Sequence, residues 1–205
     1  MASRPTLLLE QQHEGLVCGI DEAGRGPWAG PVVAATVVWP HNLTPPETLN
    51  DSKKLTRAQR EAIYHFLLDH TQFSVGVASV TEIDELNILA ATKLAMQRAV
   101  TALPVMPAVA LVDGNQPPAL PCQCQPVIRG DSLSVSIAAA SIIAKVTRDR
   151  IMEAMSQHYP DYGFERHVGY GTKQHQAALE RYGVTPEHRR SFSPIRQLLE
   201  RLQSL

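Results

Sequence analysis

The most informative residues of the chain are Gly19-Ile20-Asp21-Glu22-Ala23-Gly24-Arg25-Gly26-Pro27-Trp28-Ala29-Gly30-Pro31. An apolar segment with the composition of a strand runs into two adjacent carboxylates and then into a glycine-rich loop that holds one arginine. Adjacent side chains of a strand point to opposite faces, so a buried strand has no structural use for Asp21 and Glu22 at its end. An acidic pair beside an arginine, whose fork fits a phosphate, indicates a divalent cation held against a phosphodiester.

The alternative for this segment is a strand end followed by a tight turn, with both carboxylates solvated. Taken alone, the dipeptide Asp21-Glu22 favours that alternative. The attached loop Gly24-Arg25-Gly26 favours the cation and phosphate site instead, because glycines let backbone groups approach a ligand closely.

Length and composition predict one globular domain over residues 1–205, with a core at about 14–200 and a short flexible N-terminus. Apolar residues make up 44% of the chain and charged residues 19%, which is ordinary for a globular protein. No apolar run approaches the roughly 20 residues of a membrane span. The apolar run within the first ten residues is too short for a secretory signal. We therefore expect a cytoplasmic monomer that does not associate with membranes.

Cysteine and histidine spacing argues against two other kinds of site. The chain has three cysteines, an odd number that argues against a disulfide framework. Cys122 and Cys124 are too close for a zinc pattern, and Cys18 is interpreted as a small core residue. The eight histidines show no HExxH arrangement, so we interpret them as surface groups or as supports behind a site.

Net charge is weak evidence about partners. The formal net charge of −1 is not typical of a protein that binds nucleic acid. It is compatible with a nuclease whose carboxylates lie in the site and whose cations surround it.

The pattern along the chain predicts a mixed sheet flanked by helices. Strands are expected at residues 16–21 and 32–38, as an antiparallel pair, and at 73–80 and 108–112. Helices are expected from Thr56, with Gln59 completing a capping box, to about residue 68, and after Thr81 with apolar spacing through 88–99. After a proline-rich stretch at 117–126, a long helix spans about 135–155, a loop covers 163–172, and short helices end near residue 201. This order predicts an α/β fold with a small C-terminal helical part.

An ordered set of motifs resembles ribonuclease HII, of the type 2 ribonuclease H family. Beyond the opening segment, the set comprises Asn50-Asp51-Ser52-Lys53-Lys54-Leu55, Ile83-Asp84-Glu85-Leu86-Asn87-Ile88, Val112-Asp113-Gly114-Asn115, Gly130-Asp131-Ser132, Ala139-Ala140-Ser141-Ile142-Ile143-Ala144-Lys145-Val146, Tyr162-Gly163-Phe164, His167-Val168-Gly169-Tyr170 and Arg189-Arg190-Ser191-Phe192. The resemblance implies the ribonuclease H-like fold. It also implies an endonuclease that hydrolyses the RNA strand of RNA–DNA hybrids and cuts at single ribonucleotides in duplex DNA, leaving 5′-phosphate and 3′-hydroxyl ends.

Four carboxylates follow strands or precede the long helix: Asp21, Glu22, Asp113 and Asp131. Side chains at such ends can converge from distant parts of a sequence, and converging carboxylates repel one another unless a cation compensates them. The resemblance assigns all four as catalytic metal ligands for Mg²⁺ or Mn²⁺, with two ions expected. Taken singly, Asp113 is more readily a turn residue and Asp131 a helix cap than either is a metal ligand.

The resemblance also implies substrate contacts. It assigns Gly24, Arg25 and Gly26 to the ribose 2′-hydroxyl at an RNA–DNA junction, and Tyr170 to stacking on the neighbouring deoxyribose. For Tyr170 the competing interpretation is a partly buried ring with a hydrogen-bonded hydroxyl.

Several cations are candidates for phosphate contacts. The first are Lys53, Lys54 and Lys145, with an exposed polar turn as the alternative for the first two. Arg148 lies on the Lys145 face of the predicted long helix, with Arg150 nearby. The pair Arg189 and Arg190 is expected either to contact phosphates or to be solvated.

Three other functions compete with this interpretation. Ribonuclease HIII is disfavoured by the intact Gly24-Arg25-Gly26 and by the lack of an additional N-terminal domain in this sequence. A non-catalytic hybrid-binding module would lack some of the four carboxylates. A nucleotide-binding protein would need G-x-G-x-x-G or the Walker lysine, and this sequence has neither.

Overall fold

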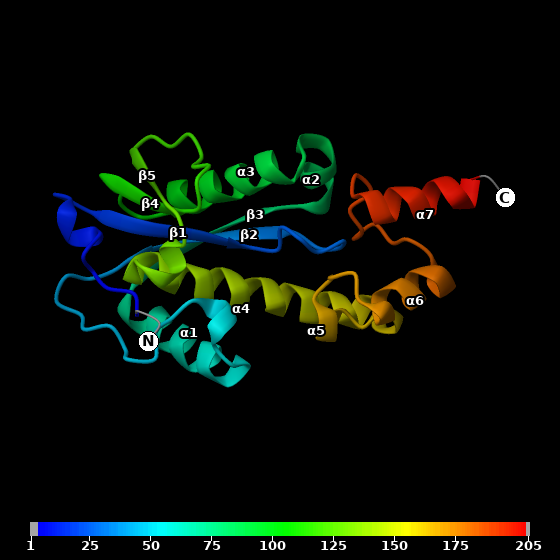
Figure 1. Ribbon diagram of the computed structural model, residues 1–205, viewed down its shortest axis with the longest axis horizontal. Helices are drawn as coiled ribbons and strands as arrows, with labels where there is room; N and C mark the ends of the chain where they lie inside the picture. The colour runs from blue at the N-terminus through cyan, green and yellow to red at the C-terminus, as the bar shows by residue number, and fades with distance from the viewer. Residues whose placement is uncertain (1–3, 204–205) are drawn as a thin grey trace.

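The computed structural model describes residues 4–203 and centres on a five-stranded mixed sheet (Figure 1). The strands are β1 (Val17–Ala23), β2 (Val32–Val38), β3 (Gln72–Ala78), β4 (Val109–Asp113) and β5 (Gln123–Val127). Their order across the sheet is β3-β2-β1-β4-β5. The pairs β1/β2 and β2/β3 are antiparallel, whereas β1/β4 and β4/β5 are parallel. The predicted α/β fold with a mixed sheet is confirmed.

Helices cover both faces of this sheet (Figure 1). The first layer contains α2 (Val80–Leu86) and α3 (Ile88–Thr101), and the second contains α1 (Arg57–His70) and α4 (Val135–His158). Because strand side chains alternate between faces, Ile20 packs in the α3 layer, whereas Ala35 and Val37 pack in the α1 and α4 layer. The core therefore consists of two apolar layers, one on each face of the β-sheet.

The central helix α4 lies unusually close to β1, and Gly19 makes this possible. A Cβ atom on Gly19 would lie 2.2 Å from the carbonyl carbon of Ser136, a separation that real atoms do not reach. The helix backbone therefore rests directly on the strand that carries Asp21 and Glu22.

Helix starts follow the expected capping chemistry with one correction. The capping box of Thr56 and Gln59 is present at the start of α1. The next helix is capped by Ser79 and not by Thr81, because the Ser79 hydroxyl accepts from the Glu82 amide while the Glu82 carboxylate accepts from the Ser79 amide. The reciprocal pair S-x-x-E fixes the helix start two residues earlier than predicted.

Three short helices form the C-terminal part at one end of the sheet (Figure 1). They are α5 (Phe164–His167), α6 (Lys173–Tyr182) and α7 (Ser193–Gln203). Their apolar side chains form a separate small core with Ala29 and with Met152 near the end of α4. The chain also contains short 3₁₀ helices: η1 (Glu10–Gln12), η2 (Ser52–Lys54), η3 (Gly130–Ser132) and η4 (Pro160–Tyr162).

Two segments differ from expectation. The proline-rich stretch contains strand β5, which tolerates Pro126 because it lies at the sheet edge. Of the N-terminal segment expected to be flexible, residues 1–3 lie outside the described residues and the next ones pack on the start of α4. There the buried Glu10 accepts hydrogen bonds from the hydroxyls of Ser134 and Ser136. Among residues 4–203, no helix is long and apolar enough to cross a membrane.

Candidate active site

The parallel strands β1, β4 and β5 bring three carboxylates together at the C-terminal ends of the strands. Ile20 pairs with Val112, so the next residues, Asp21 and Asp113, extend from neighbouring strands at the same level. The chain leaves β5 at residue 127 and reaches Asp131 in η3 on the same side. The amide of Gly130 donates to Asp113 Oδ1 at 2.7 Å and so fixes η3 against the end of β4.

We call Asp21, Asp113 and Asp131 the acidic cluster. One carboxylate oxygen from each lies within 4.8 Å of the other two. Asp21 and Asp131 are buried and Asp113 is half-buried. These three of the four predicted carboxylates are therefore gathered by the fold itself.

The electrostatics of the acidic cluster favour a bound cation. Burial raises the pKa of Asp21 well above its ordinary value, and the charges of Glu22 and Asp113 raise it further. Burial also raises the pKa of Asp131, with repulsion from Asp51 adding to the rise. Buried carboxylates that repel one another are stabilised in their charged form by a divalent ion, and all-oxygen donors suit Mg²⁺ or Mn²⁺. The residues present therefore fit such a metal.

Glu22 lies outside the acidic cluster. It lines the same cleft as Asp21 and a neighbouring pocket with Asp113, and its Oε1 accepts from Arg25 Nη1 at 3.3 Å. Burial raises the pKa of Glu22, and the Arg25 guanidinium offsets only part of that rise. That Glu22 is a metal ligand stays a prediction.

The loop after β1 is held by two buried arginines, which corrects their predicted role. Arg189 donates to the carbonyls of Gly24, Arg25, Gly30 and Pro31. Arg148 donates to the carbonyls of Ala29, Pro31 and Val168. Both side chains are fully buried, so neither contacts phosphates. They satisfy carbonyls that the irregular loop leaves without strand partners.

Gly24 is required in this loop for two reasons. Its φ of +98° lies in the left-handed region, and a Cβ atom there would lie 2.1 Å from Arg148 Nε. Arg25 and Gly26 follow it and are exposed. The loop thus presents backbone to solvent on a rigid support.

Tyr170 and the glycine loop line one cleft together. The cleft is lined by residues from β1, the glycine loop, η2 and α4, among them Asp21, Gly26, Lys53 and Tyr170. A Cβ atom on Gly26 would lie 3.4 Å from Tyr170 Cε1, so the ring lies against the loop. The Tyr170 side chain is 48% exposed, unlike a ring that fills a core.

The three lysines differ in their surroundings. Lys53 Nζ lies 3.9 Å from Asp131 Oδ2, with 80% of its side chain exposed. Lys54 donates to the Ser132 hydroxyl at 2.9 Å, and Lys145 pairs with Asp149 at 2.7 Å. Partial burial works to lower the pKa of Lys53, but the surrounding carboxylates together raise it.

The structure also contains a cluster that the sequence did not reveal. His167, His175 and His188 are buried beneath the Tyr170 loop, and the ring of His175 contacts those of the other two, so for these three the surface interpretation is wrong and the alternative of a supporting group remains. The only sequence signal that links this cluster to Tyr170 is the motif His167-Val168-Gly169-Tyr170, which contains both His167 and Tyr170. We call these three residues the histidine cluster.

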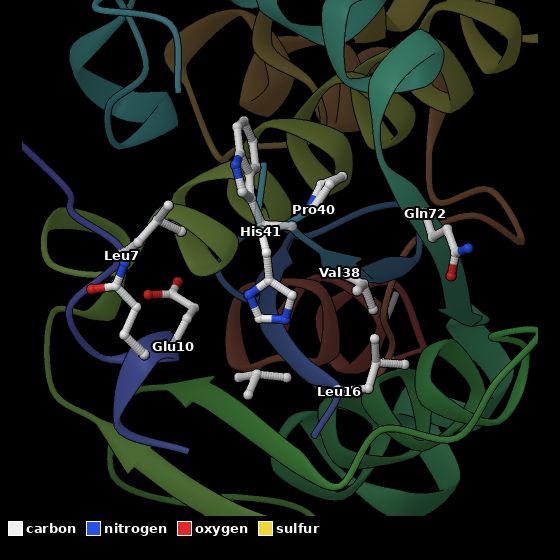
Figure 2. A pocket seen from close by; sticks show the side chains of 10 residues that line it. Leu7, Glu10, Leu16, Val38, Pro40, His41 and Gln72 are labelled. Atoms are coloured by element: carbon white, nitrogen blue, oxygen red, sulfur yellow. The ribbon is translucent and has the colours of Figure 1, made fainter. Parts of the chain in front are cut away.

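A second pocket lies at the opposite ends of the strands, away from the acidic cluster. It is lined by the start of β1 and the end of β2, and Figure 2 shows Glu10, His41 and Gln72 around it. None of the predicted site residues lines it.

Known proteins match this chain over nearly its whole length. Residues 18–195 match the family model of ribonuclease HII. The chain is 59% identical over 186 residues to ribonuclease HII of Parvibaculum lavamentivorans, covering 90% of this chain and 68% of that protein. It is 49% identical over 191 residues to ribonuclease HII of Wolbachia sp. subsp. Brugia malayi, covering 93% and 94%.

Solved structures agree with the fold. The crystal structure of ribonuclease H2 from Pyrococcus horikoshii superimposes with a TM-score of 0.75 at 31% identity, covering 93% of this chain and 100% of that one. Bst ribonuclease HIII, solved in complex with Mn²⁺, superimposes with a TM-score of 0.66 at 18% identity, which shows the fold alone; 98% of this chain and 75% of that one are covered. The chain therefore belongs to the ribonuclease HII family, and it is a divalent-metal-dependent hydrolase that acts on the RNA strand of RNA–DNA hybrids.

Proposed function

We propose that this enzyme also cuts duplex DNA at single embedded ribonucleotides, leaving 5′-phosphate and 3′-hydroxyl ends. One observation carries the proposal: Asp21 of the acidic cluster lines the same cleft as the glycine loop and Tyr170, and oxygens of Asp113 and Asp131 lie within 4.8 Å of it. A phosphodiester placed at the acidic cluster then has its neighbouring sugars beside the loop and the ring. Hydrolysis and recognition of the sugar are thereby combined in one site.

In this proposal the acidic cluster, with Glu22 at its side, holds Mg²⁺ or Mn²⁺. A pair of such ions supplies activation of a water molecule and charge stabilisation on the phosphate and on the leaving oxygen. The carboxylates fix where this chemistry occurs, since two of them sit on adjacent strands and the third is tied to Asp113 through Gly130.

The glycine loop is the proposed reader of the 2′-hydroxyl, the group that distinguishes RNA from DNA at one nucleotide. Arg189 fixes the carbonyls of Gly24 and Arg25, so the loop backbone is held before substrate arrives. A rigid backbone recognises a hydroxyl without losing conformational entropy on binding.

Tyr170 is the proposed contact to the deoxyribose next to the ribonucleotide. Its exposed ring lies against Gly26, so a sugar that stacks on it adjoins the loop that reads the ribose. A 2′-hydroxyl on the stacked sugar would stand between ring and sugar. DNA on that side of the cleavage point is therefore favoured.

The test uses a labelled DNA duplex with one ribonucleotide, an all-DNA duplex and a long RNA–DNA hybrid. We expect cleavage of the first and third with Mg²⁺ or Mn²⁺, no cleavage with EDTA, and a nick in the first that a DNA ligase reseals directly, because ligation requires a 5′-phosphate and a 3′-hydroxyl. Cleavage of the hybrid alone would refute the proposal for single ribonucleotides.

A second experiment assigns the sugar contact. Tyr170→Ala should lower kcat/KM on the single-ribonucleotide duplex about five-fold more than on the long hybrid, since ring stacking contributes about 1–3 kcal/mol per base and a sugar contact lies at the lower end. Tyr170→Phe keeps the ring and should retain most of the wild-type ratio. An unchanged ratio in Tyr170→Ala would mean that the loop reads the junction unaided.

A further inference from the structure

The histidine cluster lies directly beneath the loop that carries Tyr170. The rings of His167 and His175 stack with centroids 4.5 Å apart, and those of His175 and His188 are 5.1 Å apart. His175 and His188 have no exposed surface. They come from α6 and from the segment before α7, so the cluster joins successive elements of the C-terminal part.

The hydrogen bonds fix the protonation of each ring. The Thr185 amide donates to His188 Nδ1 at 3.0 Å, so that nitrogen carries no proton and His188 is the neutral Nε2–H tautomer. His188 Nε2 therefore donates to His175 Nε2 at 2.9 Å. His175 in turn keeps its proton on Nδ1, which donates to the Tyr170 carbonyl at 3.0 Å.

His167 is fixed in the same way. The Gly169 amide donates to His167 Nδ1 at 3.2 Å, so its Nε2 holds the proton and donates to the Tyr162 carbonyl at 2.7 Å. All six ring nitrogens of the cluster are thereby engaged. Such rings are unsuited to bind a metal ion or to transfer protons, because either role needs a free nitrogen.

The backbone of Tyr170 is held from both sides by this cluster. Its amide donates to the His167 carbonyl at 2.9 Å, and its carbonyl accepts from His175 Nδ1. The two residues before it, Val168 and Gly169, have φ values of 44° and 86°. A turn that places Val168 in the left-handed region is strained and persists only where its surroundings hold it.

We propose that His188 and His175 form a directed hydrogen-bond chain that positions Tyr170 for sugar recognition. The chain runs from the Thr185 amide through both rings to the Tyr170 carbonyl, and only neutral rings in these two tautomers complete it. Both histidines are positioning residues that act through Tyr170. This inference rests on the proposed role of Tyr170 as the sugar contact.

The first test reads the tautomers directly. Long-range ¹H–¹⁵N correlation NMR of the full chain at pH 7 should show His175 protonated on Nδ1 only and His188 on Nε2 only. The reverse tautomers, or a charged ring at either position, would overturn the chain. The spectrum needs neither substrate nor activity.

The second test uses a matched pair of variants at His175. In His175→Asn the side-chain amide nitrogen takes the place of Nδ1, so the donor to the Tyr170 carbonyl is kept. In His175→Gln the amide lies at the place of Nε2, so that donor is lost. Both replace a buried ring with an amide, and a merely structural role predicts equal effects on both. His158→Gln, at an exposed histidine at the end of α4, is the control.

The measured quantity is kcat/KM on the single-ribonucleotide duplex divided by that on the long hybrid. We expect His175→Asn to stay within about two-fold of wild type and His175→Gln to lower the ratio about as much as Tyr170→Ala does. In a Tyr170→Ala background, His175→Gln should lower the ratio no further, because both changes remove one effect. Equal ratios in the two His175 variants, or additive losses, would overturn the inference.

The outcomes also separate this inference from the proposed function. If Tyr170→Ala itself leaves the ratio unchanged, the sugar contact fails. If Tyr170→Ala lowers the ratio and His175→Gln does not, only the positioning chain fails. Should His175→Gln not fold, His188→Asn takes its place with the same expected loss, because it keeps the acceptor for Thr185 but removes the donor that holds the proton of His175 on Nδ1.

Discussion

The acidic cluster and the histidine cluster are built alike and behave differently. Each gathers three titratable side chains from separate segments, and in each cluster burial shifts the pKa of two members towards the neutral form. The pKa of Asp21 is raised by burial and by its acidic neighbours, and burial lowers the pKa of His175 and of His188 to about 4. A displaced pKa therefore does not by itself distinguish a ligand site from a supporting one.

The difference lies in the partners. Every ring nitrogen of the histidine cluster has a hydrogen-bond partner within the protein. The carboxylates of the acidic cluster chiefly face one another, and Lys53 at 3.9 Å from Asp131 is a distant countercharge. A self-satisfied cluster supports the fold, whereas a cluster of repelling charges favours a compensating ligand from outside, and three carboxylates fit a divalent cation.

The largest expected effect comes from removing one charge of the acidic cluster. Asp113→Asn keeps an oxygen that accepts from the Gly130 amide, so the local structure should persist. Turnover should fall by on the order of 10²-fold or more, since even residues one step removed from a metal contribute roughly 10–100-fold. Hybrid binding with EDTA should be unchanged.

Single-turnover cleavage and a binding assay measure these two quantities. Asp161→Asn, at an exposed aspartate outside the cluster, is the control and should have wild-type activity. Thermal unfolding without metal should show Asp113→Asn at least as stable as wild type, because one repelling charge is gone. Full activity of Asp113→Asn would contradict the metal assignment.

The next effect is on stability and concerns the support of the glycine loop. Arg189→Met leaves the carbonyls that Arg189 serves without a donor, and buried unsatisfied groups cost about 1–3 kcal/mol each. We expect the free energy of unfolding to fall by about 3 kcal/mol, measured by urea denaturation. The neighbouring Arg190→Met should change it by less than about 0.5 kcal/mol, since that side chain is exposed. Equal effects of both substitutions would show that Arg189 is dispensable.

The two clusters also differ in how far the sequence predicted them. Asp21 and Asp113 end strands that the sequence predicted, whereas the strand β5 that leads to Asp131 was not predicted, and the family resemblance supplied that residue. His175 and His188 lie in a segment of short helices, where no periodic pattern predicts which side chains meet. The same limit explains Arg148 and Arg189. Their role depends on carbonyls of a loop that is distant in sequence, and an arginine near a basic motif is typical of phosphate contact as well.

A smaller effect follows from the pH dependence of the histidine cluster. The pKa of His175 and of His188 is about 4 in the folded protein and 6.5 ordinarily. Between these values the unfolded chain binds more protons, so the free energy of unfolding should fall as the pH falls from 6.5 towards 4. We expect a loss on the order of 2 kcal/mol from the two residues, after allowance for relaxation of the fold.

Asp21 acts in the opposite direction, because its raised pKa lets the folded state bind protons first as the pH falls. Comparison with His188→Asn cancels this contribution, since the carboxylates are the same in both proteins. Urea denaturation at pH 7 and at pH 4.5 should therefore show a smaller loss in His188→Asn than in wild type. The same loss in both would mean that His188 is not buried in its neutral form.

The smallest expected effect is on substrate binding by the lysines of the cleft. These lysines also differ in whether they already have a close partner within the protein. Lys145 already pairs with Asp149 at 2.7 Å, whereas Lys53 is mostly exposed and only loosely paired. A phosphate gains most from the cation with the weaker existing partner, since no ion pair has to break first. Lys53→Gln should therefore raise the Kd for the hybrid about three-fold at 0.1 M salt, and should reduce the slope of log K against log salt by about 0.9, the contribution of one phosphate contact.

Lys145→Gln should change the Kd by less than about two-fold, as should Lys173→Gln on the exposed start of α6. If Lys145→Gln weakens binding more than Lys53→Gln, substrate binding breaks the Lys145–Asp149 pair, and a satisfied group then takes part in recognition as readily as an unsatisfied one.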